Sequence, residues 1–133
     1  MDRLLFGPDR NLVLTGISLE RDWTAHPPRE LWRQSIGAAW SGFSAVNGFA
    51  VTMEQRGEEE LVTCYEVVTG KPRWAHAVTT RHETVAGGIG PRCTPTIDDG
   101  LVYVLGATGI LRCLDGRNGA LVWSDDILRR CSV

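Results

Sequence analysis

From Glu30 onward, short hydrophobic runs alternate with polar turn signals, a pattern typical of β-strands joined by tight turns. Asn47-Gly48 is a strong hairpin signal, and Thr69-Gly70 marks a later turn. No stretch has the hydrophobic periodicity of a helix of ordinary length. Besides a run that ends at Asn47-Gly48, the expected strands are 30–36, 49–56, 61–67, 73–78, 93–97, 101–107, 110–115 and 120–127.

The two halves of this pattern repeat in register. Cys113 follows Cys64 by 49 residues, and Trp123 follows Trp74 by the same interval. Trp32 precedes Trp74 by 42 residues and begins a shorter copy of the same pattern. Four strands in about 40 to 50 residues are the signature of a β-propeller blade. The sequence therefore predicts two complete blades and the last strand of an earlier one.

Two copies of a turn motif sharpen this prediction. The first reads C-x-E-x-x-T-G-x-x-x-W and the second C-x-D-x-x-N-G-x-x-x-W. The motif resembles the tryptophan-docking motif of the pyrroloquinoline quinone (PQQ) propeller repeats, with cysteine where that family usually has alanine. The resemblance extends over roughly residues 30–128. It implies a structural role for Trp32, Glu66, Thr69, Gly70, Trp74, Asp115, Asn118, Gly119 and Trp123.

The physical chemistry of the motif agrees with that role. The acidic residue can accept N–H bonds from the turn that follows it. The glycine takes a positive φ without steric cost. The tryptophan then buries about 150–250 Å² between neighbouring blades.

The expected fold class is all-β, with four-stranded antiparallel propeller blades. The chain supplies about two and a quarter blades, whereas the resemblance implies a closed propeller of seven or eight. Residues 1–29 are expected to be irregular, 30–128 to form the blades and 129–133 to be a tail. Within the blade region, the expected units are the last strand of a preceding blade at 30–36, one blade at 43–78 and another at 92–127.

The resemblance implies two functional branches. One comprises quinone-dependent alcohol dehydrogenases, which bind PQQ and calcium. The other comprises non-enzymatic scaffolds, such as the propeller lipoprotein of the outer-membrane protein assembly machinery. Adjacent cysteines mark the dehydrogenase branch, and this chain has no Cys-Cys pair. We therefore expect a non-catalytic binding or assembly module, a fragment of a larger propeller, with no cofactor. The alternatives are a partial PQQ-dependent dehydrogenase, with PQQ and calcium, and a non-functional truncated remnant.

The connection between the two blades holds the candidate ligand-binding residues. Arg92 and Thr94 stand near the start of an innermost strand, in the region where propellers bind ligands. Arg81 and His82 lie earlier in the same connection. Solvated surface is the simpler interpretation of such loop residues. The glutamates of the stretch 53–60 are expected to lie at an exposed hairpin tip.

Composition narrows the remaining possibilities. The formal net charge is −2 and no basic block is present, which argues against a nucleic-acid partner. No hydrophobic run approaches the roughly 20 residues of a membrane span. The opening stretch MDRLLFGPDRN does not resemble a signal peptide, although the family resemblance implies a periplasmic or exported protein. The expected partner is a protein or further propeller blades, self-association included, and the cysteines are expected to be reduced and mostly buried.

Overall fold

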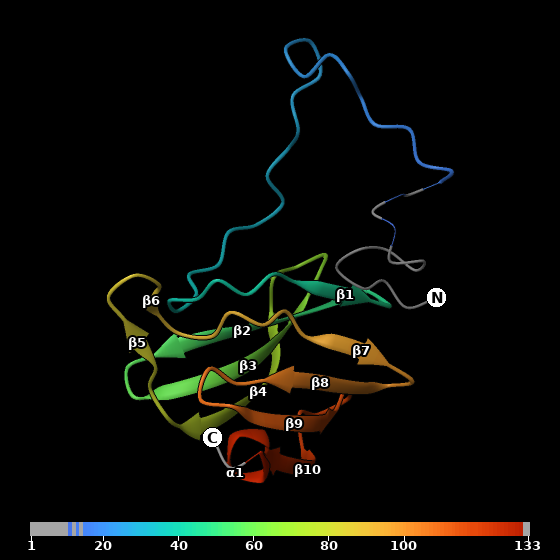
Figure 1. Cartoon of the computed structure of the whole chain (residues 1–133). Coiled ribbons are helices and arrows are strands. Elements are labelled where there is room, and N and C mark those ends of the chain that lie inside the picture. The colour runs from blue at the N-terminus through green and yellow to red at the C-terminus, as the bar shows by residue number, and fades with distance from the viewer. Residues whose placement is uncertain (1–10, 12, 14, 132–133) are drawn as a thin grey trace.

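The computed structural model describes residues 11, 13 and 15–131, which form two four-stranded antiparallel sheets, a small hairpin and one helical turn. The all-β prediction is confirmed (Figure 1). The first blade consists of β1 (Ser44–Val46), β2 (Phe49–Arg56), β3 (Glu59–Glu66) and β4 (Pro72–Thr79). The second blade consists of β7 (Thr96–Asp98), β8 (Leu101–Leu105), β9 (Ile110–Asp115) and β10 (Leu121–Asp126).

Each blade is a meander whose consecutive strands pair as neighbours. The turn between β1 and β2 is Asn47-Gly48, and both residues have positive φ, 49° and 83°. This is the backbone conformation that a two-residue hairpin requires, and Asn and Gly adopt it most readily. The hairpin signal in the sequence therefore fixes the register of the first two strands, in which Val46 pairs with Phe49.

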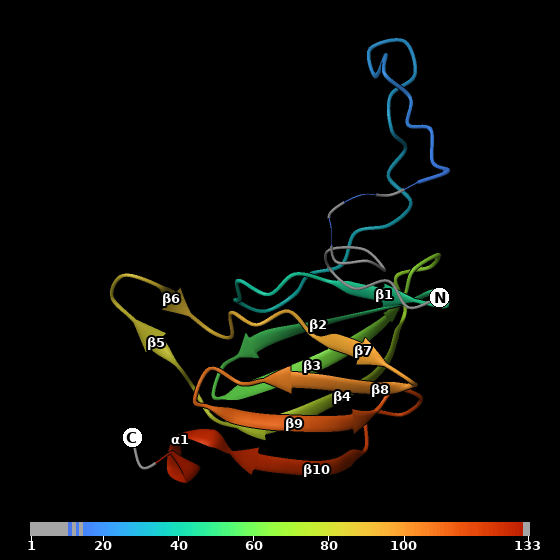
Figure 2. The same ribbon diagram turned by 45° about the vertical axis from the view of Figure 1, so that its right-hand side comes forward.

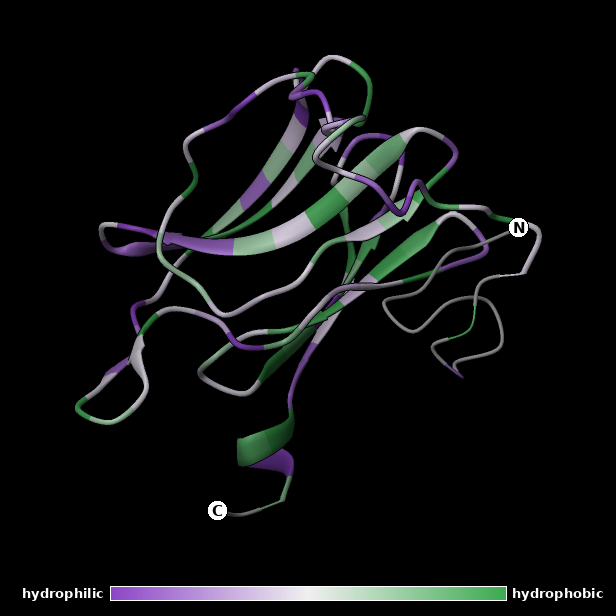
Figure 3. Ribbon diagram, turned by 90° about the horizontal axis from the view of Figure 1, so that it is seen from above, coloured by the Kyte–Doolittle hydropathy of each residue, from purple (hydrophilic) through white to green (hydrophobic). Residues whose placement is uncertain are grey.

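The core lies between the two blades, which stack face to face (Figure 2). Alternation along the strands sends hydrophobic side chains from both sheets into this layer. The buried residues of the cluster are Val51, Met53, Val62, Cys64, Ile97, Val102, Val104 and Leu114. In the hydropathy colouring of Figure 3, hydrophobic bands follow the strands, as expected for sheets buried against each other.

The expected strand at 30–36 is not formed, and this part of the prediction is wrong. The chain before the first blade leaves the sheets as a long irregular excursion (Figure 1). A strand needs a neighbouring strand edge with which its N–H and C=O groups can pair. The chain before β1 forms such a pair at one position, where Ala38 pairs with Gln55 of β2. The opening residues 1–10, for which no signal peptide was expected, lie outside the described residues.

The connection between the blades contains a hairpin that the sequence analysis did not predict. It is formed by β5 (Glu83–Thr84) and β6 (Gly88–Ile89). A single helical turn, α1 (Ile127–Arg130), follows β10. Its first turn is capped by the Asp126 side chain, which accepts a hydrogen bond from the Arg129 N–H at 3.0 Å. In the part of the chain that is described, no helix is long and hydrophobic enough to cross a membrane.

Two glutamates expected at an exposed hairpin tip are buried, which corrects that expectation. Glu54 is 0% exposed and Glu60 is 1% exposed. The period of two along a strand explains Glu60, because it shares the face of Val62 that points to the second blade. Glu54 points to the opposite face and is covered by the segment before β1. Its carboxylate accepts a hydrogen bond from the Gly37 N–H of that segment.

Candidate functional site

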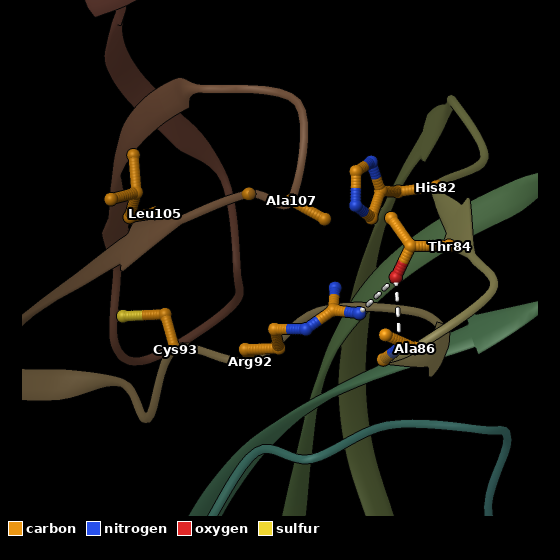
Figure 4. Close-up of a pocket in the computed structure, with 9 residues that line it drawn as sticks. His82, Thr84, Ala86, Arg92, Cys93, Leu105 and Ala107 are labelled. Carbon is orange, nitrogen blue, oxygen red and sulfur yellow. Dashed lines mark hydrogen bonds between the residues drawn. The ribbon is translucent and has the colours of Figure 1, made fainter.

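A hollow of about 590 Å³ opens between the β5–β6 hairpin and the end of β8. Its size lies within the range of small-molecule sites. Figure 4 shows the Arg92 guanidinium directed into this hollow, between Thr84 of the hairpin and the second blade. The residues that line the hollow are His82, Thr84, Ala86, Gly87, Arg92, Cys93, Leu105, Gly106 and Ala107.

Arg92 is held in place by the hairpin. Its Nη2 donates to Thr84 Oγ1 at 3.2 Å and to the Gly88 carbonyl at 3.4 Å, and its Nη1 donates to the Gly90 carbonyl at 3.2 Å. A Cβ at position 87 would lie 2.1 Å from Nη2 and 2.8 Å from Thr84 Oγ1, so a larger residue there would push the exposed guanidinium out of its present position. The guanidinium is therefore positioned before any ligand arrives.

The structure brings His82 to the same hollow but separates the other two candidates from it. Arg81 pairs with Glu83 at 3.0 Å and donates to the Gly57 carbonyl at 2.9 Å. Thr94 Oγ1 accepts the Gly42 N–H at 2.9 Å, which ties the segment before β1 to the second blade.

The wall of the hollow does not fit the ligand set of a calcium ion. Calcium takes oxygen ligands, mainly carboxylates and carbonyls, from several directions. None of the lining residues carries a carboxylate. Over the residues that the structure describes, no group of three or more His, Cys, Asp or Glu side chains is placed to hold a metal ion. No reaction step through calcium or PQQ is therefore derived for this hollow.

The motif tryptophans connect each unit to the turn of the next. Trp32 Nε1 donates to the Val67 carbonyl at 2.7 Å, and its ring covers Gly70, where a Cβ would lie 2.4 Å from the indole. Trp74 repeats this contact one blade later. Its Nε1 donates to the Gly116 carbonyl at 2.9 Å, and a Cβ on Gly119 would lie 2.5 Å from its ring. Trp32 makes this contact although its own segment is not a strand.

The remaining motif residues shape the two turns. In the first turn, the Thr69 hydroxyl donates to the Glu66 carboxylate, and Gly70 has φ +70°. In the second turn, Asp115 accepts the Arg117 N–H at 2.8 Å and pairs with the Arg117 guanidinium. Its other motif residues follow the same plan: Asn118 Oδ1 accepts the Ala120 N–H at 2.9 Å, and Gly119 has φ +72°.

Trp123 occupies the position in the second blade that Trp74 occupies in the first, but among the residues that the structure describes no further blade covers it. It is 42% exposed and packs at a tilt against Tyr103, with ring centroids 6.2 Å apart. Strand alternation places these two residues on the face of the second blade that points away from the first. We call this surface the open face, with residues Tyr103, Leu105, Leu111, Cys113 and Trp123.

Two buried polar clusters were not predicted from the sequence. Glu60 and Arg112 form an ion pair between the blades, and each side chain is 1% exposed. Glu54 accepts bonds from Arg56 at 3.0 Å and from the Thr63 hydroxyl at 2.6 Å. Burial raises the pKa of Glu54, but the hydrogen bonds from these donors and from the Gly37 N–H lower it by more. The pKa of Glu54 therefore lies below its ordinary value. The period of two along β3 signals the burial of Glu60, whereas the burial of Glu54 depends on the segment before β1 that covers it.

Comparison with known proteins identifies the family. A family model described as outer membrane protein assembly factor BamB matches residues 25–130. No curated protein sequence gives a significant match. BamB from Moraxella catarrhalis is similar in structure, with 20% identity and a TM-score of 0.49 over 65% of this chain and 23% of that chain.

Two dehydrogenase structures share the fold. Quinohemoprotein alcohol dehydrogenase from Comamonas testosteroni has 18% identity and a TM-score of 0.50, over 71% of this chain and 14% of that one. A europium-containing methanol dehydrogenase has 12% identity and a TM-score of 0.53, over 69% of this chain and 16% of that one. The chain thus spans less than a quarter of each of these proteins. The repeat motif, the stacked blades and the family match agree: this chain belongs to the PQQ-type propeller family described as outer membrane protein assembly factor BamB.

Proposed function

We propose that this chain is a non-catalytic binding and assembly module that stacks a further propeller blade on its open face. The observation that carries the proposal is the position of Trp123. Trp32 and Trp74 each cover a glycine turn of the next unit and donate to a turn carbonyl there. Trp123 stands in the same register on β10, yet it is 42% exposed.

The surroundings of Trp123 support the same conclusion. On the open face, Tyr103, Leu105 and Leu111 are only half-buried, whereas Val102 and Val104, which face the first blade, are buried. Hydrophobic residues that are left partly exposed together on one face of a sheet indicate a contact surface. The corresponding face of the first blade, with Val51, Met53 and Val62, is buried because the second blade covers it. The name of the matching family, an assembly factor, also favours a role in protein assembly.

The chemistry of the partner follows from the two contacts already made. It should present a glycine with positive φ, directly after Thr or Asn, and a free turn carbonyl beside it. The acceptor turn of the first blade meets this description, but Trp32 already occupies it. A further blade, from another chain or from additional sequence, is therefore the partner that we expect.

A pull-down with a separately expressed propeller blade of the same family tests the proposal. We expect the chain to retain such a blade, and we expect Trp123→Glu to abolish the retention. Trp23→Glu is the matched control, because Trp23 is 59% exposed on the irregular segment before the first blade and should be dispensable. A compact monomer that retains no partner would contradict the proposal. Calcium-dependent dye reduction with an alcohol and added PQQ would contradict its non-catalytic part.

A further inference from the structure

We propose that the hollow around Arg92 binds a small organic acid, with its carboxylate on Arg92 and its hydrocarbon body against the second blade. This site is independent of the assembly proposal, which rests on Trp123. Among the residues that the structure describes, Arg92 takes part in no ion pair, whereas its neighbour Arg81 is paired with Glu83.

The hydrogen bonds of Arg92 leave room for a carboxylate. A guanidinium has five N–H groups. Three are directed at Thr84 Oγ1 and the carbonyls of Gly88 and Gly90. The N–H of Nε and one N–H of Nη1 therefore remain; they lie on different edges of the guanidinium, and either can donate to an oxygen of a carboxylate. Because the hairpin already holds the guanidinium, little conformational entropy is lost when the acid binds.

The rest of the wall determines the class of anion. Cys93, Leu105, Ala86 and Ala107 give the hollow a largely hydrophobic lining. Inorganic phosphate would place several oxygens against these side chains without hydrogen-bond partners, which is costly. A carboxylate with a hydrocarbon body avoids that cost, because its apolar part leaves water for the hydrophobic wall. The His82 ring, at the same rim, is available to donate to a carboxylate oxygen.

The buried charges behind the wall do not oppose an anion. Glu60 lies behind Gly106 and Ala107, and its carboxylate accepts the Ala107 N–H at 2.8 Å. Its charge is compensated by Arg112, which is equally buried. Arg92 is therefore the charged side chain among the residues that line the hollow.

The experiment is a titration of the full chain, labelled with ¹⁵N, at constant ionic strength. The probes are sodium benzoate, its neutral analogue benzamide, and inorganic phosphate. We expect benzoate to shift the amide signals of Gly87, Gly88 and Ala107 saturably, and benzamide and phosphate to bind at least about tenfold more weakly. Phosphate binding as tight as that of benzoate would overturn the assigned class of ligand.

Two variants test the role of Arg92. Arg92→Gln should weaken benzoate binding by about tenfold or more, because a charge-assisted hydrogen bond is lost. Arg81→Gln removes a neighbouring arginine that points elsewhere and should leave the binding constant unchanged. If Arg92→Gln does not fold, Ala107→Leu, which narrows the hydrophobic part of the hollow, should also weaken binding. Absence of saturable shifts in the unmodified chain, or equal affinity in Arg92→Gln or Ala107→Leu, would overturn the proposal.

Discussion

Arg112 of the second blade pairs with Glu60 of the first, and both side chains are almost completely buried between the two sheets. The pair stands beside the hydrophobic contact of Val62 with the second blade. It is incompletely satisfied, because Arg112 Nε and Nη1 are buried without a hydrogen-bond partner in the described part of the chain. Such a pair is costly to break but does not by itself stabilise the fold.

The first prediction concerns this pair. Arg112→Met should destabilise the chain by about 3–5 kcal/mol, because it leaves the Glu60 carboxylate buried and unpaired. The double variant Glu60→Leu/Arg112→Met should lose much less, since it replaces both charges by hydrophobic groups. Urea unfolding of the full chain measures both free energies. A single variant that is as stable as the double variant would contradict this explanation.

The repeat made the blades predictable from the sequence. The interval between Trp74 and Trp123, together with Asn47-Gly48, placed the turns and strands of both blades near their observed positions. The turn signals are local, since Asn-Gly adopts the hairpin conformation by itself, and β-branched residues favour strands where a sheet can bury them. The prediction of a strand at 30–36 was wrong because a strand is not specified by local signals alone. Residues 30–36 contain the motif tryptophan, but a strand depends on a neighbouring edge that the motif does not encode.

The candidate site was predictable only in part. Arg92 and His82, which were proposed from their place in the connection between the blades, both line the hollow, and their ligand-binding role stays a prediction. Thr94 and Arg81 were separated from it by contacts with Gly42 and Glu83, which depend on how distant segments pack. The small β5–β6 hairpin that holds Arg92 gave no periodic signal, because each strand has only two residues.

The second prediction concerns pH. Burial, and then the nearby charge of Arg112, lower the pKa of His76 below its ordinary value of 6.5. The unfolded chain therefore binds a proton more readily than the folded chain, and stability rises with pH. The contribution of neutral His76 is complete above pH 6.5 and is lost as the pH falls from that value toward the folded pKa.

The measurement is the free energy of unfolding between about pH 7 and pH 5, the range in which histidine titrates. His76→Gln should flatten its slope. His26→Gln, on the exposed loop before the first blade, is the comparison variant. Glu54 also makes the folded chain more stable as the pH rises, since its pKa is lowered in the folded state. Its contribution to stability is lost only as the pH falls below 4.5. An unchanged slope in His76→Gln would contradict the assignment.

The third prediction tests the docking turn. Gly119→Ala would place a Cβ 2.5 Å from the Trp74 ring, at a backbone φ of +72°. Gly100→Ala is a matched control, because Gly100 has φ +75° and nothing lies within 4 Å of the added carbon. The control should cost about 1–2 kcal/mol from backbone strain alone. Gly119→Ala should cost about 1–3 kcal/mol more, because Trp74 must move.

Urea unfolding of both glycine variants gives these free energies. The difference between the two variants isolates the contact from the backbone conformation. Equal losses in Gly119→Ala and Gly100→Ala would show that the close approach of Trp74 contributes nothing to stability.

The last prediction uses the cysteines, which are free thiols among the described residues and differ in exposure. Burial raises the pKa of the Cys64 thiol to about 11, so almost none of it is thiolate at neutral pH. Cys131 is exposed at the end of α1 and should react first with iodoacetamide. Mass spectrometry after brief alkylation at about pH 8, near the ordinary thiol pKa, should therefore find Cys131 modified and Cys64 intact. Cys131→Ser should abolish the fast reaction, and denaturant should restore reactivity at Cys64, because unfolding exposes it. Rapid alkylation of Cys64 in the folded chain would mean that the two blades separate easily, since Cys64 belongs to the layer between them.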